Sequence, residues 1–252
     1  MKSNRLLAKL MRRTGAAEAH AFSPPVGTLL PKVISVHFPK AAGSSLVKAY
    51  ETAFGPDRVL RDDENDPLDP CGTMYLDPAR YEQMKPASVG EYAAIHGHFH
   101  IGRYDRIPDA LRVVVLREPI DNVISIYYYW KLICRRGDPG YKGHCLYRYF
   151  CEAQPSLLEF AEIPAIRCIM TGVYFRDVDM SRFDVIGDYL DAAGYLQQVA
   201  KLIGIELGPL PRVNVTEPSN ERRAALENGR MLSRLRELLS ADLTFYERYC
   251  RR

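Results

Sequence analysis

Apolar runs alternate along this chain with stretches in which apolar residues recur every three or four positions. The runs predict β-strands at 32–38, 92–99, 111–116 and 183–189, because each is short and rich in aliphatic residues. Helical spacing follows the first, the third and the fourth of them. Strands that alternate with helices form βαβ units, so we predict an α/β fold with a mainly parallel central sheet, flanked by helices on both faces.

The helical pattern has recognisable ends. One helix is expected to begin near Ser44 and Ser45, which are good capping residues. Another is expected to start at Pro119, a favourable first position, and to end before Gly137. Amphipathic helices are also predicted within 189–204 and 220–250. The last of these carries one apolar side, made of Leu232, Leu235, Leu239, Leu243 and Tyr246.

The length of 252 residues and the hydrophobic content of 47% suit one large α/β domain. We expect a single domain over 31–252, preceded by a flexible basic segment over 1–30. That segment is predicted to be a solvated tail, with peripheral membrane contact through a short amphipathic helix as the alternative. The polar stretch at 61–75 is predicted to be a surface loop that faces a substrate, with its acidic run simply solvated.

Charge and cysteine content narrow the function classes. Lys plus Arg number 34 and Asp plus Glu number 31, a balance that gives no support to nucleic-acid binding. The six cysteines form no C-x-x-C pair, which disfavours a zinc cluster, and free thiols are expected rather than disulfides. No stretch approaches the roughly 20 apolar residues of a membrane span, and the start lacks the apolar core of a signal peptide. A cytoplasmic location is therefore expected.

A glycine-bearing, hydroxyl-rich turn joins the first predicted strand to its helix. Such a turn points backbone N–H groups at one spot, where the helix dipole adds about half a positive charge. Gly43 allows close backbone approach, and Lys40 is expected to place a mobile ammonium over a bound anion. The residues expected to hold a phosphate or sulfate here are Pro39, Lys40, Ala41, Ala42, Gly43, Ser44 and Ser45.

The order of residues in this turn differs from that of the common nucleotide-binding loop. In G-x-x-x-x-G-K-[ST] the lysine follows the second glycine, whereas here Lys40 precedes Gly43. This difference disfavours an ATP or GTP hydrolase. The expected fold is P-loop-like without the usual P-loop motif.

A second candidate anion site follows the third predicted strand. Arg117 ends that strand beside a helix N-terminus, where a guanidinium can grip a phosphate with two hydrogen bonds. Ser125 lies eight residues later, about two helical turns along. Two anion sites at neighbouring strand ends would suit a nucleotide that carries two separate phosphate groups.

Three histidines lie between these two sites, at His96, His98 and His100. Alternation along a strand would turn all three to one face, which is a geometry that zinc also uses. No glutamate or cysteine follows closely enough in sequence to complete an obvious metal site, so we expect no metal. A histidine can accept a hydroxyl proton near neutral pH, which makes these residues candidate general bases.

The turn "HFPKAAGSS" resembles the 5′-phosphosulfate loop of sulfotransferases that use 3′-phosphoadenosine 5′-phosphosulfate (PAPS), of the carbohydrate and bacterial type. The segment "VVVLREPIDNVISIYYY" is similar to their 3′-phosphate element, an arginine at a strand end with a serine eight residues later. The "HGH" segment looks like that of uronyl 2-O-sulfotransferases. The similarity covers residues 33–50, 94–130 and, faintly, 184 to the end.

The resemblance implies roles for particular residues. Arg117 and Ser125 would bind the 3′-phosphate of PAPS or of its product, 3′-phosphoadenosine 5′-phosphate (PAP). His98 would be the general base, with His96 orienting or assisting it and Lys40 stabilising the leaving group. The segment "PRVNVTEPSNERR" resembles the loop that closes over the nucleotide, and the residues that it would bring to a phosphate are Arg212, Asn214 and Thr216.

The sequence thus predicts a sulfotransferase that acts on a hydroxyl of a carbohydrate or glycolipid-like acceptor. A P-loop kinase or NTPase is the alternative enzyme, and a non-catalytic binder of phosphorylated or sulfated ligands is the alternative outside catalysis. Tyrosines 127–129 are expected to pack mainly in the core, with stacking on adenine as the other interpretation. Residues 131–183 match no known pattern, and the acceptor and the oligomeric state stay open.

Overall fold

The computed structural model describes residues 32–63, 66–84, 89–107, 109–137, 143–211, 213 and 219–250. The predicted basic segment at 1–30 lies outside these residues, so its solvated or membrane-contacting character stays a prediction. The predicted single domain over 31–252 also stays a prediction.

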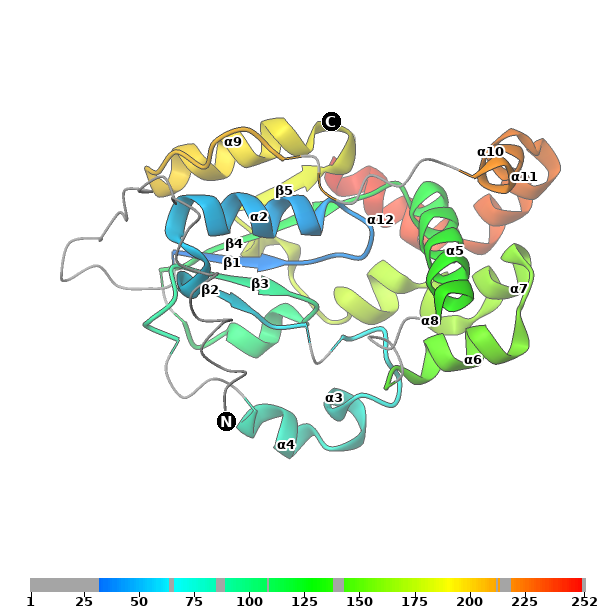
Figure 1. Cartoon of the computed structure of the whole chain (residues 1–252), viewed down its shortest axis with the longest axis horizontal. Helices are drawn as coiled ribbons and strands as arrows, with labels where there is room; N and C mark the ends of the chain where they lie inside the picture. Colours follow the sequence, from blue (N-terminus) through cyan, green and yellow to red (C-terminus); the bar gives the residue numbers. More distant parts are fainter. Residues whose placement is uncertain are drawn as a thin grey trace, which may run out of the picture.

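The described part of the chain is built around one five-stranded sheet in which every pair of neighbouring strands is parallel. The order across the sheet is β2-β3-β1-β4-β5, and helices pack around it (Figure 1). This arrangement confirms the predicted P-loop-like α/β fold. The strands are β1 (Val33–Val36), β2 (Val59–Arg61), β3 (Ala94–Gly97), β4 (Leu111–Leu116) and β5 (Val185–Asp188). Strand β2 was not predicted, because three residues are too few to show a pattern.

Two helices, α2 and α9, lie along the sheet, whereas α5 to α8, α10 and α11 gather beyond the carboxyl ends of the strands (Figure 1). The α-helices are α2 (Gly43–Phe54), α3 (Thr73–Leu76), α4 (Pro78–Gln83), α5 (Pro119–Arg136), α6 (Cys145–Ala153), α7 (Leu157–Glu162), α8 (Pro164–Arg167), α9 (Ala192–Ile203), α10 (Asn220–Glu227), α11 (Gly229–Leu238) and α12 (Ser240–Cys250). The short helical turns are η1 (Pro56–Arg58), η2 (Ile101–Tyr104), η5 (Met180–Arg182), η6 (Tyr189–Asp191) and the π-helical η4 (Ile169–Tyr174).

The predicted helix ends are partly confirmed. Helix α5 starts at Pro119, and Gly137 follows its last residue in the left-handed conformation. The expected capping by Ser44 and Ser45 is wrong, because both lie in the first turn of α2 and the N-cap is Ala42.

The C-terminal stretch forms three helices, with breaks at Asn228 and Leu239. The side chain of Asn228 caps α11, accepting from the amide of Met231, which explains the first break. Leu235, Leu239 and Tyr246 of the predicted apolar side are buried.

The strand order places a topological switch point between β1 and β4. From β1 the chain continues towards β2 and β3 on one side, and β4 and β5 follow on the other side. The loops after β1 and β4 therefore separate at the carboxyl edge, and in open α/β sheets ligands bind in the crevice at such a point. Lys40 follows β1 and Arg117 follows β4, so the fold brings the two predicted anion sites to this crevice.

The acidic run at 61–75 is not simply solvated, which corrects the expectation from the sequence. Asp62 is buried, and its carboxylate accepts hydrogen bonds from Arg103 Nε at 2.7 Å and from Tyr104 OH at 2.8 Å. The backbone of Asp62 also lies against Gly97. A Cβ at position 97 would lie 2.1 Å from the Asp62 carbonyl oxygen, so the middle residue of the "HGH" segment has to be glycine.

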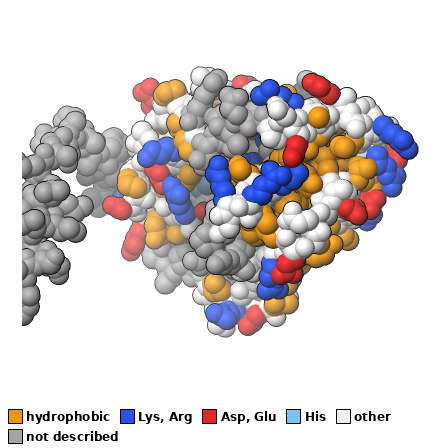
Figure 2. Space-filling model, turned by 45° about the vertical axis from the view of Figure 1, so that its right-hand side comes forward, with side chains coloured by type: hydrophobic (Ala, Val, Ile, Leu, Met, Phe, Trp, Pro, Cys, Tyr) orange, Lys and Arg blue, Asp and Glu red, His pale blue; other side chains and the backbone are white. Residues whose placement is uncertain are grey.

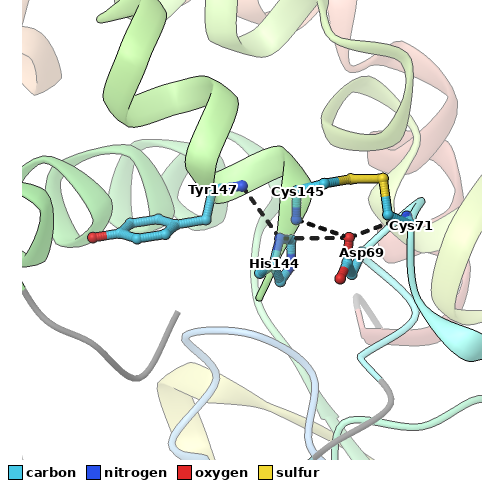
Figure 3. The surroundings of a disulfide bond; sticks show 5 residues. All are labelled: Asp69, Cys71, His144, Cys145 and Tyr147. Atoms are coloured by element: carbon cyan, nitrogen blue, oxygen red, sulfur yellow. Dashed lines mark hydrogen bonds and ion pairs between the residues drawn. A yellow bond between two sulfur atoms is a disulfide. The ribbon is translucent and has the colours of Figure 1, made fainter. Parts of the chain in front are cut away.

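Two disulfides are present, Cys71–Cys145 and Cys134–Cys151, while Cys168 and Cys250 are free thiols. The expectation of free thiols is therefore wrong for four of the six cysteines. Their Cα atoms lie 5.9 and 5.8 Å apart, within the range for a bridge, and only the tertiary fold sets these distances. Figure 3 shows Asp69 beside the first bridge, where Asp69 Oδ1 accepts from the backbone N–H groups of Cys71 and Cys145.

The disulfides bear on where the protein works. Disulfides persist mainly in oxidising compartments, so two of them weigh against the expected cytoplasmic location. Among the described residues, no helix combines the length and the apolar character needed to cross a membrane.

Of the two disulfides, Cys71–Cys145 is expected to contribute more to the stability of the fold. Cys71 and Cys145 are 74 residues apart, so the chain-entropy relation gives a loss of about 4.5 kcal/mol in the free energy of unfolding for Cys71→Ser with Cys145→Ser. The second bridge closes 17 residues and is expected to contribute about 3 kcal/mol. Urea titrations of both double variants, with Cys168→Ser as the control, measure these losses. An unchanged midpoint for Cys71→Ser with Cys145→Ser would contradict the bridge.

Candidate functional site

The loop after β1 has an unusual backbone. Lys40 and Ala42 both adopt left-handed conformations, with φ of 58° and 64°. Left-handed residues on both sides of another residue make a concave nest of N–H groups, a shape that binds anions. Each left-handed residue other than glycine costs roughly 1–3 kcal/mol. The surrounding structure must hold the strain in place.

Helix α5 and Arg117, two residues before it, supply that support. The side chain of Asn122, fully buried, donates to the Pro39 carbonyl at 2.6 Å, and Arg117 Nη1 donates to the Lys40 carbonyl at 2.6 Å. Two carbonyl oxygens of the loop are thereby turned towards α5. The N-terminus of α2 carries the positive end of the helix dipole, which favours an anion at this point. Sequence reasoning missed Asn122.

Gly43 starts helix α2 directly under the His37 ring. A Cβ at this position would lie 1.8 Å from His37 Nε2, so no other residue fits without moving the histidine. Ser45, in the first turn of α2, is buried, and its hydroxyl accepts from the Val213 amide at 3.3 Å. Val213 therefore contacts the start of α2. The predicted Arg212, Asn214 and Thr216 lie outside the described residues.

Lys40 is half-buried. Its Nζ lies 4.0 Å from the centre of the Tyr129 ring, a cation–π contact. Burial, with Arg117 and Arg222 nearby, lowers the pKa of Lys40 to about 8. A lysine so placed gains from a bound anion, because the anion compensates both the lost hydration and the neighbouring positive charges.

Arg117 joins the two predicted anion sites. The residue is 6% exposed, and its Nη1 reaches the Lys40 carbonyl and, at 3.3 Å, the Ser125 hydroxyl. Its Nε and Nη2 both lie 2.7 Å from Asp121 Oδ2, and its guanidinium lies over the Tyr189 ring. The predicted residues of both sites are thus brought together, with Asp121 as the present counter-charge of Arg117.

A cavity of about 160 Å³ opens between α5 and the start of α10. Arg222 of α10 lies in its wall, and its Nη2 is 3.3 Å from Asp121 Oδ1. Sequence reasoning missed Arg222, although it lies within the segment that resembles the nucleotide-closing loop. On this side of the molecule, basic side chains lie beside hydrophobic ones (Figure 2). The lining residues are Lys40, Ser125, Tyr128, Tyr129, Lys131, Leu132, Arg135, Ser219, Glu221 and Arg222.

The three tyrosines of α5 divide between core and cavity. Tyr127 is buried and donates to the Pro155 carbonyl at 3.0 Å. Tyr128 and Tyr129 are partly buried against the core and also line the cavity. Core packing and contact with a ring ligand are therefore compatible for these two residues.

His96 is buried beneath the site, with 2% of its surface exposed, and its Nδ1 lies 2.9 Å from Ser35 Oγ. Burial, assisted by His98 and then Arg61, lowers the pKa of His96 to about 3. A neutral, enclosed His96 suits support of the site rather than contact with an acceptor.

His98 is half-buried and lies at the site itself. Its ring stacks on His37, with 4.0 Å between centroids and 23° between planes. Its Nδ1 lies 3.0 Å from the Tyr174 hydroxyl. The expected alternation of the three histidines stops early, because β3 ends at Gly97. His100 lies elsewhere: its Nδ1 accepts from the Gly102 amide and its Nε2 contacts the Arg176 carbonyl.

Two groups of described residues have metal-ligand atoms within 4.8 Å of one another. In the first, His37, Asp63 and His98, the two rings are stacked, so an ion cannot lie in the plane of both, where imidazole lone pairs point. In the second, Asp69, Cys71 and Cys145, both sulfurs are used in the disulfide. Neither donor set fits a metal well, and metal independence stays a prediction.

No protein-family model matches this sequence, and no curated protein matches it. Among solved structures, a sulfotransferase from Alicyclobacillus acidocaldarius is similar, at 18% sequence identity. The match covers 87% of this chain and 100% of that chain, with a TM-score of 0.37. A likeness at this level decides neither the family nor the activity of this protein.

Proposed function

We propose that this protein transfers a sulfuryl group from PAPS to a hydroxyl of a carbohydrate or glycolipid-like acceptor. One observation carries the proposal: the guanidinium of Arg117 contacts both the Lys40 carbonyl and the Ser125 hydroxyl. The two predicted sites for anionic oxygens therefore adjoin at the switch point of the sheet. A single nucleotide with phosphate groups at its 5′ and 3′ positions would match that pair.

The donor would lie across the crevice. Its 5′-phosphosulfate would sit at the N-terminus of α2, against the nest and Lys40. Its 3′-phosphate would bind Arg117 and Ser125, with Arg222 on the opposite wall, and would share Arg117 with Asp121. Tyr129 borders the cavity between them and offers a flat face to adenine.

Sulfuryl transfer would then proceed by in-line displacement at sulfur. The acceptor oxygen forms a bond to sulfur while the bond from sulfur to the bridging phosphate oxygen breaks, and PAP leaves. His98 takes the proton of the acceptor hydroxyl. Lys40 and the amides of the loop after β1 stabilise the charge that grows on the bridging oxygen. By analogy with phosphoryl transfer, the positioning of the reactants and this electrostatic stabilisation supply most of the rate acceleration.

The test is to incubate the protein with sulfur-labelled PAPS and pooled sugar and glycolipid acceptors, and to follow transfer of the label. Transfer that depends on the acceptor supports the proposal. Tight binding of ATP with magnesium and no preference for a 3′-phosphate would favour the kinase alternative. Binding of PAP or sulfated sugars without any transfer would favour a non-catalytic binder, and either result overturns the proposal.

Arg117→Ala is expected to weaken PAP binding by about 1.5–3 kcal/mol, the usual contribution of hydrogen bonds to a charged group. Isothermal titration calorimetry measures the change. Because Arg117 also holds the Lys40 carbonyl, thermal unfolding of the variant is recorded alongside. Arg135→Ala is the matched control, because it removes an exposed arginine that lines the same cavity but pairs with Glu221. The loss of PAP affinity should be smaller in this variant than in Arg117→Ala. Unchanged affinity in Arg117→Ala would remove this residue from the 3′-phosphate site.

A further inference from the structure

His98 stands at one end of a chain of hydrogen bonds that reaches two distant parts of the sequence. Its Nδ1 lies 3.0 Å from the hydroxyl of Tyr174, which is the last residue of η4. The same hydroxyl donates to Asp66 Oδ1 at 2.6 Å. Asp66 belongs to the loop at 61–75, and Tyr174 belongs to the stretch 131–183 that no sequence pattern identified.

The direction of these bonds follows from the groups involved. An ionised carboxylate has no proton to donate, so the single hydroxyl proton of Tyr174 goes to Asp66. The tyrosine oxygen can then only accept from His98, and Nδ1 must carry the hydrogen. In a neutral imidazole the other nitrogen, Nε2, keeps its lone pair.

Further contacts hold the segment of Tyr174 and the side chain of Asp66 in place. Asp242, a fully buried carboxylate of α12, accepts from the amides of Met170 and Thr171 at 2.8 and 3.0 Å, at the start of η4. Asp66 Oδ1 also accepts from the Leu68 amide at 2.9 Å. A few residues further on, the disulfide Cys71–Cys145 ties the loop to α6 (Figure 3).

We propose that Asp66 and Tyr174 are positioning residues that hold His98 with its proton on Nδ1 and leave Nε2 as the atom that accepts the proton of the acceptor hydroxyl. The catalytic role of Nε2 rests on the proposed function. The hydrogen-bond relay, which runs from His98 through Tyr174 to Asp66, does not. The relay has a second effect. When His98 takes a proton its ring becomes positive, and the Asp66 carboxylate, acting through Tyr174, stabilises that charge.

The neighbouring groups are consistent with this assignment. His37 covers one face of the His98 ring, and burial, with His98, His96 and Lys40 nearby, holds the pKa of His37 well below its usual value. His37 therefore stays neutral and does not compete for the proton. The exposed Asp63 is a further charged group here, with a carboxylate oxygen within 4.8 Å of ligand atoms of His37 and His98.

Nitrogen-15 NMR of histidine-labelled protein tests the relay without any donor or acceptor. Spectra are taken at a pH high enough that the His98 signals no longer change, with His98→Gln used to assign them. We expect the Nδ1–H form in the native protein. Tyr174→Phe removes the acceptor, and Asp66→Ala frees the tyrosine proton to point at Nδ1, so both variants should move the proton to Nε2.

Tyr75→Phe is the matched control. Its hydroxyl donates to the Pro67 carbonyl at 2.7 Å, so the variant removes a tyrosine hydroxyl from the same loop without touching His98. Its NMR spectrum should keep the Nδ1–H form. An Nε2–H form in the native protein, or an Nδ1–H form that persists in both Tyr174→Phe and Asp66→Ala, would overturn the relay.

Kinetics then separate the relay from the proposed function. If transfer occurs, Tyr174→Phe should lower kcat by roughly 10- to 100-fold, part of the contribution of a general base, with PAP affinity unchanged. An unchanged kcat in Tyr174→Phe overturns the positioning role even where the NMR result holds. If no acceptor is ever sulfated, the NMR result still decides the relay, and only the proposed function fails.

Discussion

His98→Ala is expected to lower the turnover number by roughly 10²- to 10⁴-fold, the contribution of a positioned general base. The expectation follows from the place of the ring: half-buried at the carboxyl edge of the sheet, stacked on His37 and bonded through Nδ1 to Tyr174. In His98→Ala the proton of the acceptor hydroxyl has to go to water. The loop after β1 and Arg117 stay in place. Donor binding should therefore change little.

Initial-rate measurements at saturating PAPS with the natural acceptor check the loss, and PAP calorimetry checks that the donor site is intact. His100→Ala serves as the control, because His100 contacts the Gly102 amide and the Arg176 carbonyl instead. Near-native turnover in His98→Ala would remove this residue from the chemistry and leave the relay with a structural role only.

Lys40→Ala is expected to lower turnover by about 10²-fold or more, because it removes the charge that stabilises the leaving phosphate. The ammonium lies on the Tyr129 ring, beside the crevice that Arg117 and Arg222 also border. In a site partly shielded from water, a charge of this kind acts more strongly than it would in solution. Lys48→Ala, which removes an exposed lysine from the helix that follows the loop, α2, should leave the rate unchanged.

The lowered pKa of Lys40 adds a pH dependence to this prediction. With a pKa of about 8, the free lysine is charged below that pH and neutral above it. The ratio kcat/KM for PAPS, which reports on the free enzyme, should therefore fall as the pH rises through about 8. Lys40→Arg should shift the fall to higher pH, because a guanidinium stays charged there. A flat profile in the native protein would show that Lys40 does not touch the donor.

Several features of the fold were predictable because they depend on neighbours in sequence. Strand β4 has six residues, all aliphatic except Arg112, and α5 begins at Pro119 and ends before Gly137, as expected. The turn after β1 was predicted from its residues to bind an anion, and the structure adds how the turn is held. The sheet order could not be read, because it depends on which strands pair and β2 has only three residues.

Features that depend on distant contacts were missed or misjudged. The disulfide partners are separated by 74 and 17 residues, and Tyr174 is 108 residues from Asp66. His96 and His98 look equivalent in sequence, yet one is enclosed beside Ser35 and the other opens to the site. Burial separates them, and only the packed molecule sets burial.

The sequence by itself determined the alternation of strands and helices, and it put Lys40 and Arg117 just past the ends of two strands and His98 near the end of a third, because these depend on residue type and short-range spacing. The tertiary structure decided that the three strands are neighbours, so that Arg117 meets both the Lys40 carbonyl and Ser125. It also decided that Tyr174 and Asp66 meet His98. Such contacts arise from the simultaneous packing of many side chains, which no local pattern records.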